Sequence, residues 1–124
     1  MYSSFIQITG FVNVWRRYRL TDDDLRALEG QLSRNPDSGA VIAGTGGVRK
    51  TRFAPPSRHV GKSGAFRVVY LHLPVRNEIY FISLFAKSER QNVTDAEKAR
   101  YKAIVDLLKS RGHWCSKGAT GREN

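Results

Sequence analysis

Between residues 48 and 86 the hydrophobic pattern of the chain follows a period of two. Successive side chains of a β-strand point to opposite faces, so this period is typical of strands. Three stretches rich in Val, Ile, Phe and Tyr carry it, at residues 48–54, 65–73 and 78–86. A loop that begins with two prolines separates the first two, and a turn with Pro74 separates the last two. We therefore predict three antiparallel strands joined by hairpin-like loops.

Helical patterns flank these strands. After a short strand near residues 5–8, the hydrophobic residues of 11–18 follow the spacing of one helical face. Thr21 and the three aspartates after it are typical of a helix start, and we predict a helix at 22–34. A capping-box pattern also begins the last helix, which we predict at 95–109.

A length of 124 residues fits one domain. The order of elements predicts an α+β fold, in which helices pack on one face of a mainly antiparallel sheet. We expect residues 1–110 to form the folded domain. Residues 111–124 have neither periodicity nor apolar mass, and we expect them to form a flexible tail.

The charge of the chain indicates a polyanionic partner. There are 21 lysines and arginines against 11 acidic residues, a formal net charge of +10. Nine of the basic residues and two of the acidic ones lie between residues 49 and 90, which gives this segment a net charge of +7. The chain has one cysteine and no apolar run of the roughly 18 residues that span a bilayer. We therefore expect a cytoplasmic protein with no membrane partner.

Motifs for nucleotide hydrolysis and metal chemistry are missing. Gly61, Lys62 and Ser63 resemble the end of a phosphate-binding loop, but Pro56 stands where that loop needs glycine. The histidines and the cysteine do not have the spacing of metal ligands, so we expect neither a metal nor a cofactor. The glycines of 44–47 indicate a turn with positive φ angles, and a phosphate-binding nest of N–H groups is the alternative.

Basic residues at strand spacing are the strongest functional signal in the residues themselves. Lys50 and Arg52 lie two apart on one predicted strand and share a face, and Arg67 begins the next strand. A half-exposed sheet also carries cations on its solvated face, and this is the alternative reading. Carboxylates are scarce nearby, which favours an anion as the neutralising partner. We predict that all three side chains project from one face, within reach of a single phosphate.

Four segments follow the predicted helix at 22–34 in a recognisable order, at residues 35–39, 41–54, 61–70 and 85–89. Together they resemble the RelE/HigB family of bacterial toxins, in its HigB-like branch, over roughly residues 5–108. The resemblance implies a RelE/ParE-like fold, a curved, mainly antiparallel sheet with two N-terminal helices and a C-terminal helix. It also implies a type II toxin that cleaves messenger RNA, usually on the ribosome, and a cognate antitoxin with a helix-turn-helix domain.

The resemblance also assigns roles to single residues. By position, Lys50, Arg52 and Arg67 match basic residues around the scissile phosphate, and Lys87 is expected to replace an arginine that RelE has one position later. The catalytic tyrosine of RelE falls in register near Thr94, which fits better as a helix N-cap, so the tyrosine role is vacant. We assign catalysis to Lys50, Arg52, Arg67 and Lys87. We assign RNA binding to Arg49, Arg58, Lys62 and Arg90.

Such a site suits a reaction without metal, because RNA supplies its own 2′-OH nucleophile and cations can hold and neutralise the phosphate. A lysine among arginines can act as the general base, while arginine forms paired contacts to phosphate oxygens. The first hypothesis is therefore a metal-independent mRNA endoribonuclease. The alternatives are a toxin of the same fold that acts on a protein target such as gyrase, and a basic module that binds RNA or DNA without cleaving it.

Overall fold

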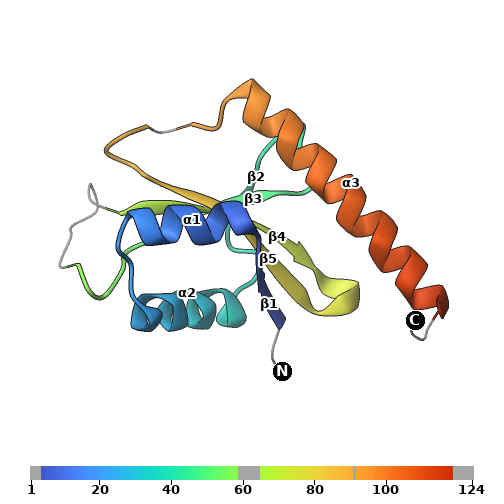
Figure 1. Ribbon diagram of the computed structural model, residues 1–124, viewed down its shortest axis with the longest axis horizontal. Helices are drawn as coiled ribbons and strands as arrows, with labels where there is room; N and C mark the ends of the chain where they lie inside the picture. Colours follow the sequence, from blue (N-terminus) through green and yellow to red (C-terminus); the bar gives the residue numbers. More distant parts are fainter. Residues whose placement is uncertain (1–3, 59–64, 91, 119–124) are drawn as a thin grey trace.

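A five-stranded sheet forms the centre of the computed structural model, which describes residues 4–58, 65–90 and 92–118 (Figure 1). Its strands, in the order β1-β5-β4-β3-β2, are antiparallel except for the parallel pair of β1 and β5. The bounds are Ser4–Gln7 for β1, Ala40–Val41 for β2, Arg49–Phe53 for β3, Phe66–Leu73 for β4 and Glu78–Ala86 for β5. The predicted antiparallel strands are confirmed, and β2 is an additional strand that the sequence pattern did not indicate.

Helices cover both faces of the sheet. Helices α1 (Thr9–Arg17) and α2 (Asp22–Arg34) pack on one face through residues such as Phe11 and Leu28. Helix α3 (Asp95–Gly118) packs on the other, which we call the α3 face, and Figure 1 shows it well apart from α1 and α2. The predicted α+β class is confirmed, but the prediction that the helices share one face is wrong. Strands β4 and β5 are hydrophobic on both faces, and each face needs a cover.

The two longer helices begin as the sequence predicts. Thr21 and Asp24 form a capping box, with each side chain accepting a hydrogen bond from the other residue's backbone N–H. At α3, the Thr94 hydroxyl accepts from the Glu97 N–H, and the Glu97 carboxylate accepts from the Thr94 N–H. The interpretation of Thr94 as a helix N-cap is therefore confirmed.

Helix α3 is longer than predicted. It continues to Gly118, whereas the sequence pattern placed its end at residue 109. Each residue added to an existing helix gains a backbone hydrogen bond without a new nucleation step, so a helix can extend past the end of its hydrophobic pattern. Residues 119–124 lie outside the described residues, and the division into a domain of 1–110 and a tail of 111–124 stays a prediction.

The loop before β3 requires its glycines. Gly44, Gly46 and Gly47 have φ angles of 81°, 80° and 122°, values that other residues rarely adopt. A Cβ atom on Gly46 would also lie 3.4 Å from the Val105 side chain, because the loop passes directly beneath α3. The prediction of a turn with positive φ angles is confirmed. No helix within the described ranges is both long and apolar enough to cross a membrane.

Candidate nucleic-acid interface

The three cations singled out in the sequence share one face of the sheet. Arg52 on β3 pairs directly with Arg67 on β4, and Lys50 pairs with Val69, two residues farther along β4. Val69 belongs to the core beneath α3, so all three side chains belong to the α3 face. Directly opposed residues have Cβ atoms about 5 Å apart, and diagonal neighbours about 7–8 Å. The prediction of a common face is confirmed, and we call Lys50, Arg52 and Arg67 the basic cluster.

Arg67 has an unsatisfied donor. Among the buried side-chain nitrogen and oxygen atoms of the described residues, its Nη1 is the one without a hydrogen-bond partner. Leaving a buried donor unpaired costs about 1–3 kcal/mol, more when the group is charged. Phe85 of β5 pairs with Arg67 from the side opposite Arg52, so Arg67 lies between an arginine and a phenylalanine in the sheet. An anionic ligand is the kind of partner that would satisfy it.

A third arginine on this face, Arg90, is paired with a carboxylate of the protein. The Arg90 guanidinium lies over the Phe85 ring, 4.4 Å from its centroid. Its two terminal nitrogens donate to the two carboxylate oxygens of Glu97, at 2.6 and 2.8 Å. The hydrogen bonds from Arg90 are the main cause that lowers the pKa of Glu97 to about 2, and the same contact raises the pKa of Arg90. The pair is therefore ionised at neutral pH and has no net charge.

Of the remaining basic residues of the segment, Lys87 lies beside the strand that carries Arg67, and Arg49 lies on the other face of the sheet. Lys87 follows β5 directly, and its N–H donates to the Ala65 carbonyl at 3.1 Å, which holds it beside the start of β4. Arg49 lies opposite Tyr70, on the face of α1 and α2, and donates to the carbonyls of Asp37 and Gly39.

Arg58 also lies away from the basic cluster. Its guanidinium donates to the Tyr18 carbonyl and lies 5.8 Å from the ring centroid of Phe66, a residue of the core beneath α1 and α2. The structure therefore brings neither Arg49 nor Arg58 to the face of the basic cluster. Lys62 lies outside the described residues.

The tyrosines within the described ranges do not fill the vacant tyrosine role at the cluster. Tyr101 of α3 is on the correct face but is only 3% exposed, and burial is the main cause of its raised pKa. Tyr80, on the same face, bonds to Arg76 and Glu78 at the far end of β5. Tyr70 belongs to the opposite core, and Tyr18 packs against that core while its hydroxyl donates to Glu89 and accepts from the Ala86 N–H. None of these four tyrosines is one of the side chains that the strand register places beside Lys50, Arg52 and Arg67.

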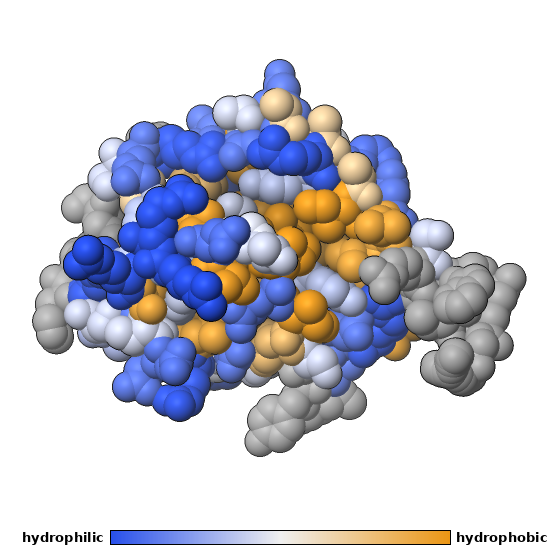
Figure 2. Space-filling view, viewed as in Figure 1, coloured by the Kyte–Doolittle hydropathy of each residue, from blue (hydrophilic) through white to orange (hydrophobic). Residues whose placement is uncertain are grey.

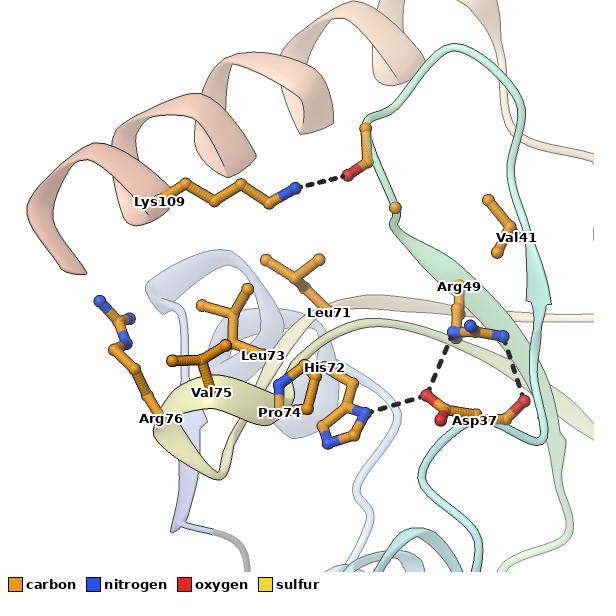
Figure 3. Close-up of a pocket in the computed structure, with 12 residues that line it drawn as sticks. Asp37, Val41, Arg49, Leu71, His72, Leu73, Pro74, Val75, Arg76 and Lys109 are labelled. Carbon is orange, nitrogen blue, oxygen red and sulfur yellow. Dashed lines mark hydrogen bonds and ion pairs between the residues drawn. The ribbon is translucent and has the colours of Figure 1, made fainter. Parts of the chain in front are cut away.

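A cleft lies elsewhere on the molecule. A cavity of about 650 Å³ opens between the end of β4, the 3-10 turn η2 (Pro74–Arg76) and α3 (Figure 3). Its floor is apolar, with Leu71 and Leu73, and Figure 2 shows hydrophobic side chains gathering where α3 meets the sheet. Its cations already bond within the protein: Arg49 to Asp37, Arg76 to Glu78 and Lys109 to the Gly46 carbonyl. These pocket cations therefore have partners within the protein, whereas Arg67 of the basic cluster keeps a buried nitrogen without one.

Sequence reasoning missed the contact among Phe85, Arg90 and Glu97. Phe85 fitted the pattern of a core strand, and Glu97 fitted a capping box, so neither indicated a surface role. Arg90 and Glu97 are seven residues apart, across the connection between a strand and a helix. No local pattern predicts such a pair, because the path of the connection sets its geometry.

Comparison with known proteins agrees with this architecture. A solved structure of E. coli toxin RelE, a variant with two arginines replaced by alanine, in the free state, has a TM-score of 0.52 and 15% sequence identity. The match covers 87% of this chain and 100% of the RelE chain, and at this identity it shows a shared fold. The family model for the RelE toxin of the RelE/RelB toxin-antitoxin system matches residues 8–113. Since that match spans most of the sequence, the protein belongs to the RelE family of toxins from toxin-antitoxin systems.

Proposed function

We propose that this toxin is a metal-independent endoribonuclease that cleaves messenger RNA at the basic cluster. One observation carries the proposal: the buried Nη1 of Arg67 lacks a partner, on a face where Arg52 and Lys50 add further positive charge. The membership of the RelE family supports the same reaction class. A scissile phosphate would satisfy Arg67 and reduce the repulsion among the cations.

The proposed reaction uses the RNA's own nucleophile. A lysine, Lys50 or Lys87, accepts the proton of the 2′-OH, and the oxygen attacks the adjacent phosphorus. The bond from phosphorus to the 5′-oxygen breaks, and that oxygen takes up a proton from the second lysine. Arg52 and Arg67 hold the phosphate oxygens and stabilise their charge in the transition state. The products are a 2′,3′-cyclic phosphate and a 5′-hydroxyl end.

The test is cleavage of a 5′-labelled RNA, free and bound to ribosomes, with and without excess chelator. We expect cleavage to persist in chelator, and Arg67→Ala to lower kcat/KM by roughly 100-fold or more, the loss typical for one transition-state contact. Arg26→Ala is the matched control, because Arg26 lies on α2 and its side chain is 73% exposed. Loss of cleavage in chelator, restored by a divalent ion, would contradict the mechanism.

The same experiment separates the alternatives. Growth arrest without RNA cleavage would favour a protein target, and RNA binding without cleavage or arrest would favour a binding module. Higher activity on ribosome-bound RNA than on free RNA would support the ribosome as the site of action. The proposed substrate also implies a cytoplasmic protein.

We also propose that a cognate antitoxin with a helix-turn-helix domain neutralises this toxin. Family membership supports an antitoxin as the partner class. Co-expression with the product of the adjacent gene tests this. We expect a stable complex and relief of growth arrest.

A further inference from the structure

The contact among Phe85, Arg90 and Glu97 has the geometry of a fixed planar surface. One side of the Arg90 guanidinium rests on the Phe85 ring, at 4.4 Å, and its outer edge is held by both oxygens of Glu97. Glu97 is itself fixed, because it also accepts from the Thr94 N–H at 2.9 Å at the start of α3. The Arg90 side chain is nevertheless 34% exposed. A planar cation is therefore held rigidly with part of its surface open to solvent.

This arrangement does not favour a phosphate as the ligand of Arg90. Both terminal nitrogens donate to Glu97, so a phosphate that bound this edge of the guanidinium would have to replace that carboxylate. Because the pKa of Glu97 is about 2, the carboxylate is charged at neutral pH and would repel a phosphate in the same place. The flat side of a guanidinium, which stacks on aromatic rings, is a different surface from the edge that Glu97 holds.

The position of this surface fits a nucleobase. Phe85 pairs directly with Arg67 across β4 and β5 and carries Arg90 on its ring, so Phe85 links Arg90 to the residue proposed to hold the scissile phosphate. In single-stranded RNA each phosphate has bases on either side, and such bases commonly stack on aromatic side chains or arginine planes.

We propose that Arg90, supported by Phe85 and Glu97, is a stacking platform for one unpaired base of the RNA, next to the scissile phosphate. The inference rests on the proposed function, because it concerns the same substrate at the same face. It makes Arg90 a positioning residue whose contribution depends on a base. Glu97 acts only through Arg90, by fixing the plane of its guanidinium.

The test is binding of RNA oligonucleotides that carry a 2′-deoxy nucleotide at the mapped cleavage position, so that they stay intact. One abasic nucleotide is placed in turn at each position around the cleavage point. We expect one abasic position to weaken binding to the unmodified toxin by roughly 5- to 150-fold, the range of stacking on one base. Arg90→Ala and Arg90→Lys should bind the normal RNA more weakly, and should be insensitive to that abasic position. Arg26→Lys should behave like the unmodified toxin.

Three results would overturn the platform. The first is unmodified toxin that binds every abasic RNA as tightly as normal RNA, which needs no variant to fold. The second is normal RNA affinity in Arg90→Lys, together with RNA binding by Arg90→Ala that depends less steeply on salt. This result indicates that Arg90 contacts a phosphate. The third is an equal loss of affinity for normal and abasic RNA in both variants, together with a lower Tm. This result indicates that Arg90 holds α3 in place and does not contact a base. If RNA is still cleaved in these cases, the platform alone fails; if RNA is neither bound nor cleaved, the proposed function fails with it.

Discussion

At the scale of single residues, the arginines of the basic segment differ in whether their nitrogens have partners within the protein. Arg49, Arg58 and Arg90 donate to carbonyls or to a carboxylate of the protein. Arg67 instead keeps a buried nitrogen without a partner. A buried, unpaired donor destabilises a protein, so its presence on a basic face is an argument for a ligand.

Arg67→Ala is therefore expected to reduce activity without reducing stability. The substitution removes an unpaired donor, and the gain of about 1–3 kcal/mol offsets the packing lost with the side chain. We expect the free energy of unfolding to stay within about 0.5 kcal/mol of the original, or to rise. Urea denaturation measures this beside the cleavage assay. A large fall in stability would show that Arg67 has a structural partner.

The pair of Arg90 and Glu97 predicts an acid-sensitive contribution to stability. The folded protein lowers the pKa of Glu97 from an ordinary 4.5 to about 2. The contribution is therefore fully present above about pH 4.5, and it is lost as the pH falls toward 2. Its upper limit is about 3 kcal/mol, since one pKa unit corresponds to about 1.4 kcal/mol.

Denaturation curves at pH 6 and pH 3, for the original chain and Glu97→Gln, check this prediction. Glu97→Gln should lose less stability than the original chain on acidification. Some acid sensitivity should remain in the variant, because the pKa of Asp37 is also lowered, mainly by its hydrogen bond with His72. Equal losses in the two proteins would contradict the assignment.

At the scale of elements, one carboxylate joins a helix to a distant loop. Asp24 of α2 is fully buried and accepts from the Thr21 N–H, from the Ser57 N–H at 2.9 Å and from the Ser57 hydroxyl at 2.5 Å. These contacts complete the capping box and tie the segment after β3 to the start of α2. The helix cap and the loop therefore depend on the same side chain.

Asp24→Ala should consequently destabilise the protein by about 2–4 kcal/mol. The substitution removes the capping box and leaves the Ser57 donors without their partner. Asp23→Ala is the control, because the Asp23 side chain is 85% exposed and should change stability by no more than about 0.5 kcal/mol. Thermal or urea denaturation of the two variants gives the comparison. Similar small effects would show that the buried contacts add little.

At the scale of the whole molecule, charge and apolar surface favour different partners. The net charge of +10 attracts any polyanion, and salt screens that attraction. Apolar side chains such as Val41 and Val75 are also exposed, and salt does not weaken apolar contacts. A protein partner can use both kinds of surface, whereas RNA depends mainly on charge.

RNA binding should therefore weaken with salt more steeply than binding of the antitoxin. For three phosphate contacts, a rise from 0.1 to 0.5 M salt should weaken RNA binding by about 30-fold. We expect the affinity of the antitoxin to change by less than about 10-fold over this range. Titrations of both partners at several salt concentrations measure the two slopes. Parallel slopes would show that inhibition is purely electrostatic.

The sequence by itself determined most elements of this protein and the common face of its basic cluster. Strand periodicity placed Lys50 and Arg52 on one side, and the antiparallel register brought Arg67 beside them. Helix caps such as Thr94 could also be predicted, because the residues that form a capping box lie within four positions of one another. These features are local, and a short stretch of chain suffices to encode them.

Only the tertiary structure decided which groups of the protein the arginines contact and which face each helix covers. Arg90 is engaged by Glu97, and Arg58 by the Tyr18 carbonyl 40 residues away, so their basic character in the sequence did not reveal their partners. Helix α3 lies opposite α1 and α2 because β4 and β5 are hydrophobic on both sides. These contacts join groups that are far apart in the sequence, so local patterns do not reveal them. Burial makes the contacts stable, because an unpaired polar group or an uncovered apolar face raises the free energy of the folded protein.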